Sequence, residues 1–298
     1  MKRTIVFVII ILLLSTAFIG CQRKELTGDE KIIKEYALMV KDNVEPLELI
    51  KYVDKNISKV NEKNADRLIM GIEKAKEFHI GRYTSIVFDK ERQKKLIALF
   101  PNKFEYNRIE EIQDEGLKEA VVEMYNGGYK LQNIEGAYYP ALDYEYLKKY
   151  NKYLSGEIND YIEIMAKESG EQAIIEGHRA VDWDELESRT INAENYINKY
   201  PEAVRRPVIG EVLFHYLKVY LLDDGKVDLE NNTIKTEVIK EYEKVIENHP
   251  NMVTTEILKE YVDIVKKNNY KVTKDVENYE KTFYVKGLMD INKKFDLD

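Results

Sequence analysis

Cysteine is almost absent from this chain of 298 residues, which contains a single one, Cys21. One thiol cannot form a disulfide within the chain, so the fold must depend on packing alone. Proline and glycine are also scarce, with 6 and 14 residues. Because few residues interrupt helices, the composition favours long helices. No second long apolar run follows residue 21, so the sequence predicts no further membrane-spanning segment.

An excess of positive charge is missing as well. The 46 Lys and Arg residues face 54 Asp and Glu, which gives a net charge of −8. This balance argues against a nucleic-acid partner, because nucleic acids are bound through clustered Lys and Arg. The sequence also lacks a Gly-rich phosphate loop, a zinc signature and a hydrolase elbow, and its four histidines are scattered. No cofactor is therefore expected.

The first residues carry the most distinct pattern of the chain. Lys2 and Arg3 form a short basic start, residues 5–14 are apolar, and small residues follow at 15–17. A basic end, a short apolar core and small residues before a cleavage point are typical of a secretory signal. A membrane span needs about 20 apolar residues, so an uncleaved membrane helix is the weaker alternative. A plain secretory signal followed by an incidental thiol is a second one.

The end of this segment resembles the lipobox of bacterial lipoproteins, a tetrapeptide of small residues that ends in the modified cysteine. Gly20 fits that pattern before Cys21, Ile19 is acceptable, and Phe18 stands where leucine is more usual. The resemblance implies cleavage after Gly20 and lipidation of the Cys21 sulfur, with palmitate-type acyl chains. Two or more such chains hold a protein stably on a bilayer, whereas one is marginal.

The lipobox resemblance divides the start of the chain into a signal peptide, 1–20, and a polar lipidated tether, 21–30. It implies a lipid-anchored protein on the extracytoplasmic face of the cell membrane, with the membrane itself as one partner.

Helical periodicity dominates the remainder and predicts an all-α fold, either a bundle or an array of helical hairpins. An N-terminal helical subdomain is expected over 31–128, with one of its helices over 109–124. The stretch 129–140 loses the period and contains Gly136 and Pro140, so it is expected to be irregular or a short β-hairpin between subdomains. A C-terminal helical subdomain is expected over 141–298.

Some helix ends are predicted from single residues. Ser155, Asp182 and Thr254 are predicted N-caps in the C-terminal subdomain. Asp42 and Asn43 are predicted to end the first helix of the N-terminal subdomain.

Part of the C-terminal subdomain, about 184–270, resembles tetratricopeptide-type helical repeats. Pro201 and Pro250 each separate two predicted helices, and Tyr242 stands eight residues before Pro250, as in those repeats. Ala193 stands at the same distance before Pro201, and the Trp, Leu-Gly and Tyr signature of the repeats is missing. A plain helical bundle remains the alternative.

One short motif suggests catalysis. The Glu168-Ser169 pair near the end of a predicted helix resembles the pair of lytic transglycosylases, in which the Glu acts as general acid. The complete Gly-Leu-Met-Gln stretch of that family does not occur in 171–298. The alternative is an exposed Glu followed by Gly170 as an ordinary helix stop.

Two acidic clusters could suggest a metal ion, but each has a simpler explanation. In the first, Asp182 suits a helix N-cap, and the acids after it suit a first helical turn. The second lies in the polar loop 223–233 and does not match the spacing of a calcium-binding EF-hand. No metal site is predicted from either cluster, whose members are His178, Asp182, Asp184 and Glu185, and Asp223, Asp224, Asp228 and Glu230.

The 22 tyrosines are the remaining unusual feature. Tyr146, Tyr150 and Tyr153 share one face of a predicted helix and are expected in the core. Tyr138 and Tyr139 lie in the irregular stretch, and exposed aromatic rings there could contact a ligand. The speculative ligand-binding residues are therefore Glu135, Tyr138, Tyr139 and Asp143.

These observations predict a membrane-anchored extracytoplasmic lipoprotein that is not an enzyme. The expected role is a non-catalytic platform that binds an envelope protein or peptide. A lipoprotein that binds a small saccharide or peptide is the first alternative. A cell-envelope glycan hydrolase or lyase that uses Glu168 is the second.

Overall fold

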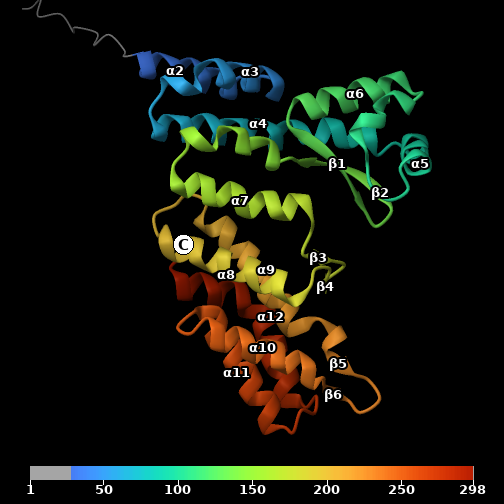
Figure 1. Cartoon of the computed structure of the whole chain (residues 1–298), viewed down its shortest axis with the longest axis vertical. Helices are drawn as coiled ribbons and strands as arrows, with labels where there is room; N and C mark the ends of the chain where they lie inside the picture. The colour runs from blue at the N-terminus through green and yellow to red at the C-terminus, as the bar shows by residue number, and fades with distance from the viewer. Residues whose placement is uncertain (1–27, 298) are drawn as a thin grey trace, which may run out of the picture.

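The computed structural model describes residues 28–297, so Cys21 and the predicted signal peptide lie outside the described residues. The described chain forms an elongated stack of helices, with α2 at one end and the α11–α12 turn at the other (Figure 1). Its short strands form three two-stranded sheets between sequence neighbours, with one isolated bridge from Thr233 to Lys271, so the predicted all-α class is confirmed. No helix within this range is long and apolar enough to cross a membrane.

The first half of the chain contains five α-helices and one β-hairpin. Two 3-10 helices, η1 and η2, lie between them. The bounds are α2 (Gly28–Lys41), α3 (Pro46–Asn56), η1 (Ile57–Lys59), α4 (Glu62–Val87), α5 (Lys90–Leu99), η2 (Tyr106–Glu111), α6 (Glu115–Asn126), β1 (Tyr129–Ile134) and β2 (Ala137–Leu142).

The second half is a series of helices with two very short strand pairs between them. The bounds are η3 (Glu145–Tyr153), α7 (Gly156–Gly170), β3 (Ile174–Ile175), β4 (His178–Arg179), α8 (Trp183–Lys199), α9 (Arg206–Leu222), η4 (Asp224–Lys226), β5 (Val227–Asp228), β6 (Thr233–Ile234), α10 (Thr236–Asn248), α11 (Val253–Lys267) and α12 (Lys274–Phe295). The last helix, α12, runs back to the middle of the stack and packs against α9.

The start of α2 differs from the predicted tether. The helix begins at Gly28, so residues 28–30 of the predicted segment 21–30 are helical. Asp29 lies in the first turn, where a negative charge is favourable beside the unpaired backbone amides. Its carboxylate also accepts hydrogen bonds from the side chains of Asn61 and Asn64, at 2.7 and 3.1 Å. These contacts join the first turn of α2 to the first turn of α4.

Other boundaries follow their capping residues. The predicted caps Ser155 and Asp182 are confirmed, because each accepts a hydrogen bond from a first-turn amide of its helix. The helix predicted over 109–124 is wrong in its first part. Asp114 accepts from the amide of Leu117, so a new helix begins there and η2 remains separate. Thr254 is not a cap but lies inside α11, which begins after Met252.

The stretch 129–140 belongs to a regular β-hairpin, the ordered one of the two predicted alternatives. Its strands pair in register from Tyr129 and Leu142 to Ile134 and Ala137. The two turn residues, Glu135 and Gly136, both have positive φ, 53° and 79°. Such a turn matches the right-handed twist of the strands.

Buried side chains group differently from the two predicted subdomains, 31–128 and 141–298. The larger apolar core extends from Ile33 in α2 to Leu297 after α12. A smaller core lies between the last turns of α4, α5, α6 and the hairpin, and we call this part the hairpin lobe. The helices α2 and α3 therefore share their core with the C-terminal half.

Helix α4 joins the two cores, and polar contacts fix this joint. Lys76, which is 1% exposed, donates a hydrogen bond of 2.8 Å to the carbonyl of Gly128 at the start of the hairpin. The hydroxyl of Tyr129 donates to the carbonyl of Lys76 at 2.8 Å. One turn earlier, the buried Glu73 accepts from the hydroxyls of Tyr144 and Tyr161 and forms an ion pair with Arg205. Four elements, η3, α4, α7 and the start of α9, are thereby connected.

Candidate functional site

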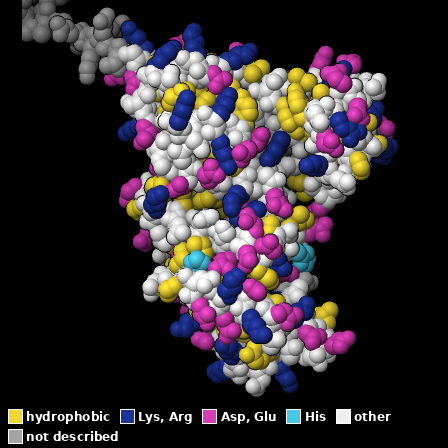
Figure 2. All heavy atoms as spheres, in the orientation of Figure 1, with side chains coloured by type: hydrophobic (Ala, Val, Ile, Leu, Met, Phe, Trp, Pro, Cys, Tyr) yellow, Lys and Arg dark blue, Asp and Glu magenta, His cyan; other side chains and the backbone are white. Residues whose placement is uncertain are grey.

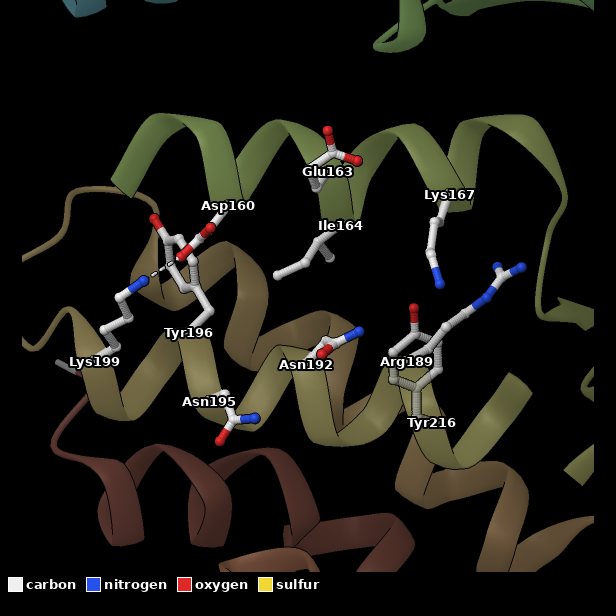
Figure 3. A pocket seen from close by; sticks show the side chains of 10 residues that line it. All are labelled: Asp160, Glu163, Ile164, Lys167, Arg189, Asn192, Asn195, Tyr196, Lys199 and Tyr216. Carbon is white, nitrogen blue, oxygen red and sulfur yellow. Dashed lines mark hydrogen bonds and ion pairs between the residues drawn. The ribbon is translucent and has the colours of Figure 1, made fainter. Parts of the chain in front are cut away.

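A groove between α7 and α8, with a volume of about 280 Å³, is the strongest candidate site (Figure 3). Asp160 and Lys199 stand at one end and Lys167 and Arg189 at the other. We call it the α7–α8 groove. Its lining residues are Asp160, Glu163, Ile164, Lys167, Arg189, Asn192, Asn195, Tyr196, Lys199 and Tyr216.

The two walls of the groove are antiparallel helices. The segment that connects them contains the short strands β3 and β4. Ion pairs across the gap fasten its ends. Lys199 on α8 is 2.8 Å from Asp160 on α7, and Lys167 on α7 is 3.4 Å from Glu185 on α8. Between these pairs the side chain of Ile164 points from α7 toward α8. The helices are thus held side by side at both ends of the groove.

Arg189 is the best-anchored side chain of the groove. Its side chain is 4% exposed, and its guanidinium lies 2.7 Å from the carboxylates of both Glu168 and Glu185. It also donates to the carbonyl of Glu171 at 2.6 Å. Burial by itself lowers the pKa of Arg189, but the hydrogen bonds to Glu168 and Glu185 outweigh it and raise the pKa. Arg189 therefore stays charged and acts as a structural centre.

Two amide side chains in the middle of the groove have a different character. Asn192 and Asn195 are exposed and stand one turn apart on α8. Both line the groove; in Figure 3 Asn192 lies on the side of α8 near Ile164, and Asn195 lies at the edge of the groove, farther from α7. Neither carboxamide forms a hydrogen bond with any of residues 28–297, so their donors and acceptors are available to a ligand.

Tyr138, predicted as part of a ligand-binding lip, is in the wrong place for that role. It is 0% exposed, and its hydroxyl donates to the carbonyl of Phe100 at 2.5 Å. The carbonyl of Tyr138 accepts a hydrogen bond from the Gln93 carboxamide at 2.6 Å, and the backbone amide of Tyr138 donates to the oxygen of the same carboxamide at 2.8 Å. Strand alternation turns one of two neighbouring tyrosines inward, and the sequence did not indicate which one. A buried ring cannot contact a ligand.

The other three predicted residues do not converge on one site. Tyr139 faces away from Tyr138 and packs its ring against Phe88, with centroids 5.0 Å apart. Glu135 lies in the turn of the hairpin. Asp143 follows the last residue of β2, and its carboxylate lies 3.8 Å from the ammonium group of Lys130. The strand between them has six residues, so about 20 Å of extended chain separates the two carboxylates.

The carboxylate of Glu168, the candidate catalytic acid, accepts hydrogen bonds from two neighbouring side chains. Its Oε1 accepts from the Arg189 guanidinium and, at 2.6 Å, from the hydroxyl of Tyr216. Burial and the charge of Glu168 both raise the pKa of Tyr216, so this phenol remains a donor. A general acid must hold a proton that it can deliver. Glu168 Oε1 instead serves as the acceptor of two donors from neighbouring helices.

The residues of the first acidic cluster separate in the structure. Asp182 caps α8, Asp184 pairs with Lys244, and Glu185 pairs with Arg189. His178 lies 3.3 Å from Asp223, which also accepts from the amide of Arg179. Within residues 28–297 no three His, Cys, Asp or Glu side chains gather closely enough to hold a metal ion.

One feature of the sequence that points to the groove is the spacing of asparagines in α8, none of which was among the predicted site residues. Asn192, Asn195 and Asn198 recur every third position in one helix. Asparagine is a weak helix former, because its side chain competes for backbone hydrogen bonds. Three asparagines on the exposed face of one helix are therefore a signal that these side chains have a use beyond helix formation. Which two of them line a groove depended on where α7 packs, and periodicity along α8 does not contain that information.

Comparison of the chain with models of known protein families, with curated proteins and with solved structures gave no match.

Proposed function

We propose that the protein is a lipoprotein, anchored through Cys21 to the extracytoplasmic face of the cell membrane, that binds a polypeptide partner without catalysis. The α7–α8 groove is its binding site. The observation that supports this proposal most directly is the pair of free carboxamides of Asn192 and Asn195 in the middle of the groove.

The character of the groove supports binding rather than chemistry. Its charged groups are largely neutralised by one another, as in the pairs formed by Lys199 and Asp160 and by Arg189 and Glu168. Figure 2 shows acidic and basic side chains mixed over this face of the stack, so the face presents no single-sign field. A ligand is then selected by hydrogen bonding and shape in the groove rather than by charge.

A crosslinking experiment in intact cells tests the proposal. A photoreactive amino acid replaces Asn195 in the full chain, and illumination should give an adduct that protease digestion removes. The same amino acid in place of Asn198 is the matched control, because Asn198 is exposed on the same helix but does not line the groove. Adducts of equal yield from both positions, or an adduct that only glycan-cleaving enzymes degrade, would contradict polypeptide binding in the groove.

The membrane anchor is tested separately. The Cys21→Ser variant should leave the membrane fraction, because the thiol that carries the acyl chains is gone. Mass spectrometry of the native N-terminus should find acyl groups on Cys21. A Cys21→Ser protein that stays as membrane-bound as the wild type would refute the anchor.

A further inference from the structure

We infer that the α7–α8 groove binds the main chain of an extended peptide through the carboxamides of Asn192 and Asn195, with one apolar side chain of that peptide facing Ile164. This inference rests on the proposed function and names the form of polypeptide that the groove accepts.

The spacing of the two amides is the first argument. Side chains three residues apart on a helix have Cβ atoms about 5–6 Å apart. In an extended peptide, every second residue directs its N–H and C=O to the same side, and such residues are about 6.6 Å apart. The carboxamides of Asn192 and Asn195 can therefore each pair with one of two such residues. Each carboxamide offers both a donor and an acceptor, which matches the N–H and C=O of one residue.

The remaining walls of the groove are the second argument. Side chains of an extended peptide alternate between opposite faces. With the main chain paired to α8, the residue between the two paired ones directs its side chain toward the floor. Ile164, which is 8% exposed, lies there between the helices. A volume of about 280 Å³ suits one such side chain and a short length of backbone.

The aromatic residues of the groove argue against a saccharide. Tyr196 and Tyr216 line the groove but are each 2% exposed, so their ring faces are covered by protein. A sugar that packs on an aromatic face needs that face open to the ligand. A peptide main chain needs only the amides, which are exposed on Asn192 and Asn195.

Selected peptides provide the test. Short random peptides are selected for binding to the full-length protein in detergent, and the best binder is synthesised with a fluorescent label. Asn192→Ala and Asn195→Ala should each weaken its affinity about tenfold, the effect of losing one or two hydrogen bonds. Asn198→Ala, on the same helix outside the groove, should leave the affinity unchanged.

Methylation of single backbone nitrogens in the same peptide then separates the two proposals. We expect a loss of about tenfold or more at two positions that are two residues apart, and little change at the others. Replacing the residue between them by aspartate should also weaken binding. If affinity depends on both asparagines but tolerates methylation everywhere, main-chain recognition is refuted while peptide binding stands. If no peptide binds, or binding ignores both asparagines, both proposals fail.

Discussion

Replacing Lys76 by methionine should stabilise the protein at neutral pH, because the folded state holds this ammonium group away from water. Lys76 is 1% exposed, and its one hydrogen bond within the described chain goes to the carbonyl of Gly128. Burial lowers its pKa from 10.5 to about 7, although the charges of Asp143 and Glu73 act in the opposite direction. The unfolded chain has no such penalty, so folding favours the neutral amine.

The magnitude follows from the shift in pKa. A difference of about 3.5 pKa units corresponds to roughly 5 kcal/mol, which is an upper bound on the cost of burying the charged form. Methionine removes that cost but leaves the carbonyl of Gly128 without its donor, a loss of about 1–3 kcal/mol. The expected net gain for Lys76→Met at pH 7 is therefore about 2–4 kcal/mol.

The pH dependence gives a sharper test than the gain itself. Between pH 7 and 10 the unfolded chain binds a proton at Lys76 that the folded protein does not bind. The free energy of unfolding of the wild type should then rise with pH relative to Lys76→Met, by about 1.4 kcal/mol per pH unit. Below pH 7 both states of the wild type are protonated, and the difference should be constant. Urea denaturation followed by circular dichroism at several pH values measures both proteins.

A matched control removes the effect of simply losing a charge. Lys74 is exposed on the same helix, so Lys74→Met should give a profile parallel to that of the wild type. Measurements should stay below pH 9.5, because burial raises the pKa of tyrosines such as Tyr36 and their ionisation in the unfolded chain destabilises the protein at higher pH. Parallel profiles for the wild type and Lys76→Met would refute the reasoning.

Four further substitutions test the packing. Glu194→Ala should lower the free energy of unfolding by about 2–4 kcal/mol, because the buried carboxylate accepts from the first two backbone amides of α11; an unchanged melting temperature would contradict this role. Gly71→Ala should cost about 1–3 kcal/mol, since a Cβ would overlap the ring of Tyr36, whereas Gly81→Ala meets nothing within 4 Å and should stabilise α4 by up to about 1 kcal/mol. Gln93→Leu should reduce amide protection in the hairpin, because its carboxamide satisfies two buried main-chain groups there; equal hydrogen exchange would show that these bonds are dispensable.

Local features of the fold were predictable from the sequence. Ser155 and Asp182 cap the helices that they were expected to cap, since such caps depend on the residues of one turn. The hairpin at 129–140 was one of two predicted alternatives, and Gly136, which adopts positive φ without strain, forms part of its turn. The end of the first helix at Asp42 and Asn43 was also visible.

Features that depend on packing between distant segments were not predictable. Tyr138 is buried because Gln93 and Phe100, about 40 residues earlier in the chain, meet it. The groove depends on Ile164 and Asn192 facing the same gap, and neither position is unusual by itself. Periodicity identifies the apolar face of a helix but not the partner of that face.

The packing of Leu297 against Gly210 has a consequence for how this chain reaches its native state. A Cβ at Gly210 would overlap the Leu297 side chain, so the last described residues fit closely into the middle of α9. An array built from neighbouring units can acquire structure progressively while it leaves a ribosome or a translocon. Here the middle of the stack stays incomplete until Leu297 has been synthesised and packs against α9, so a chain truncated before Leu297 would expose apolar surface halfway along the described residues.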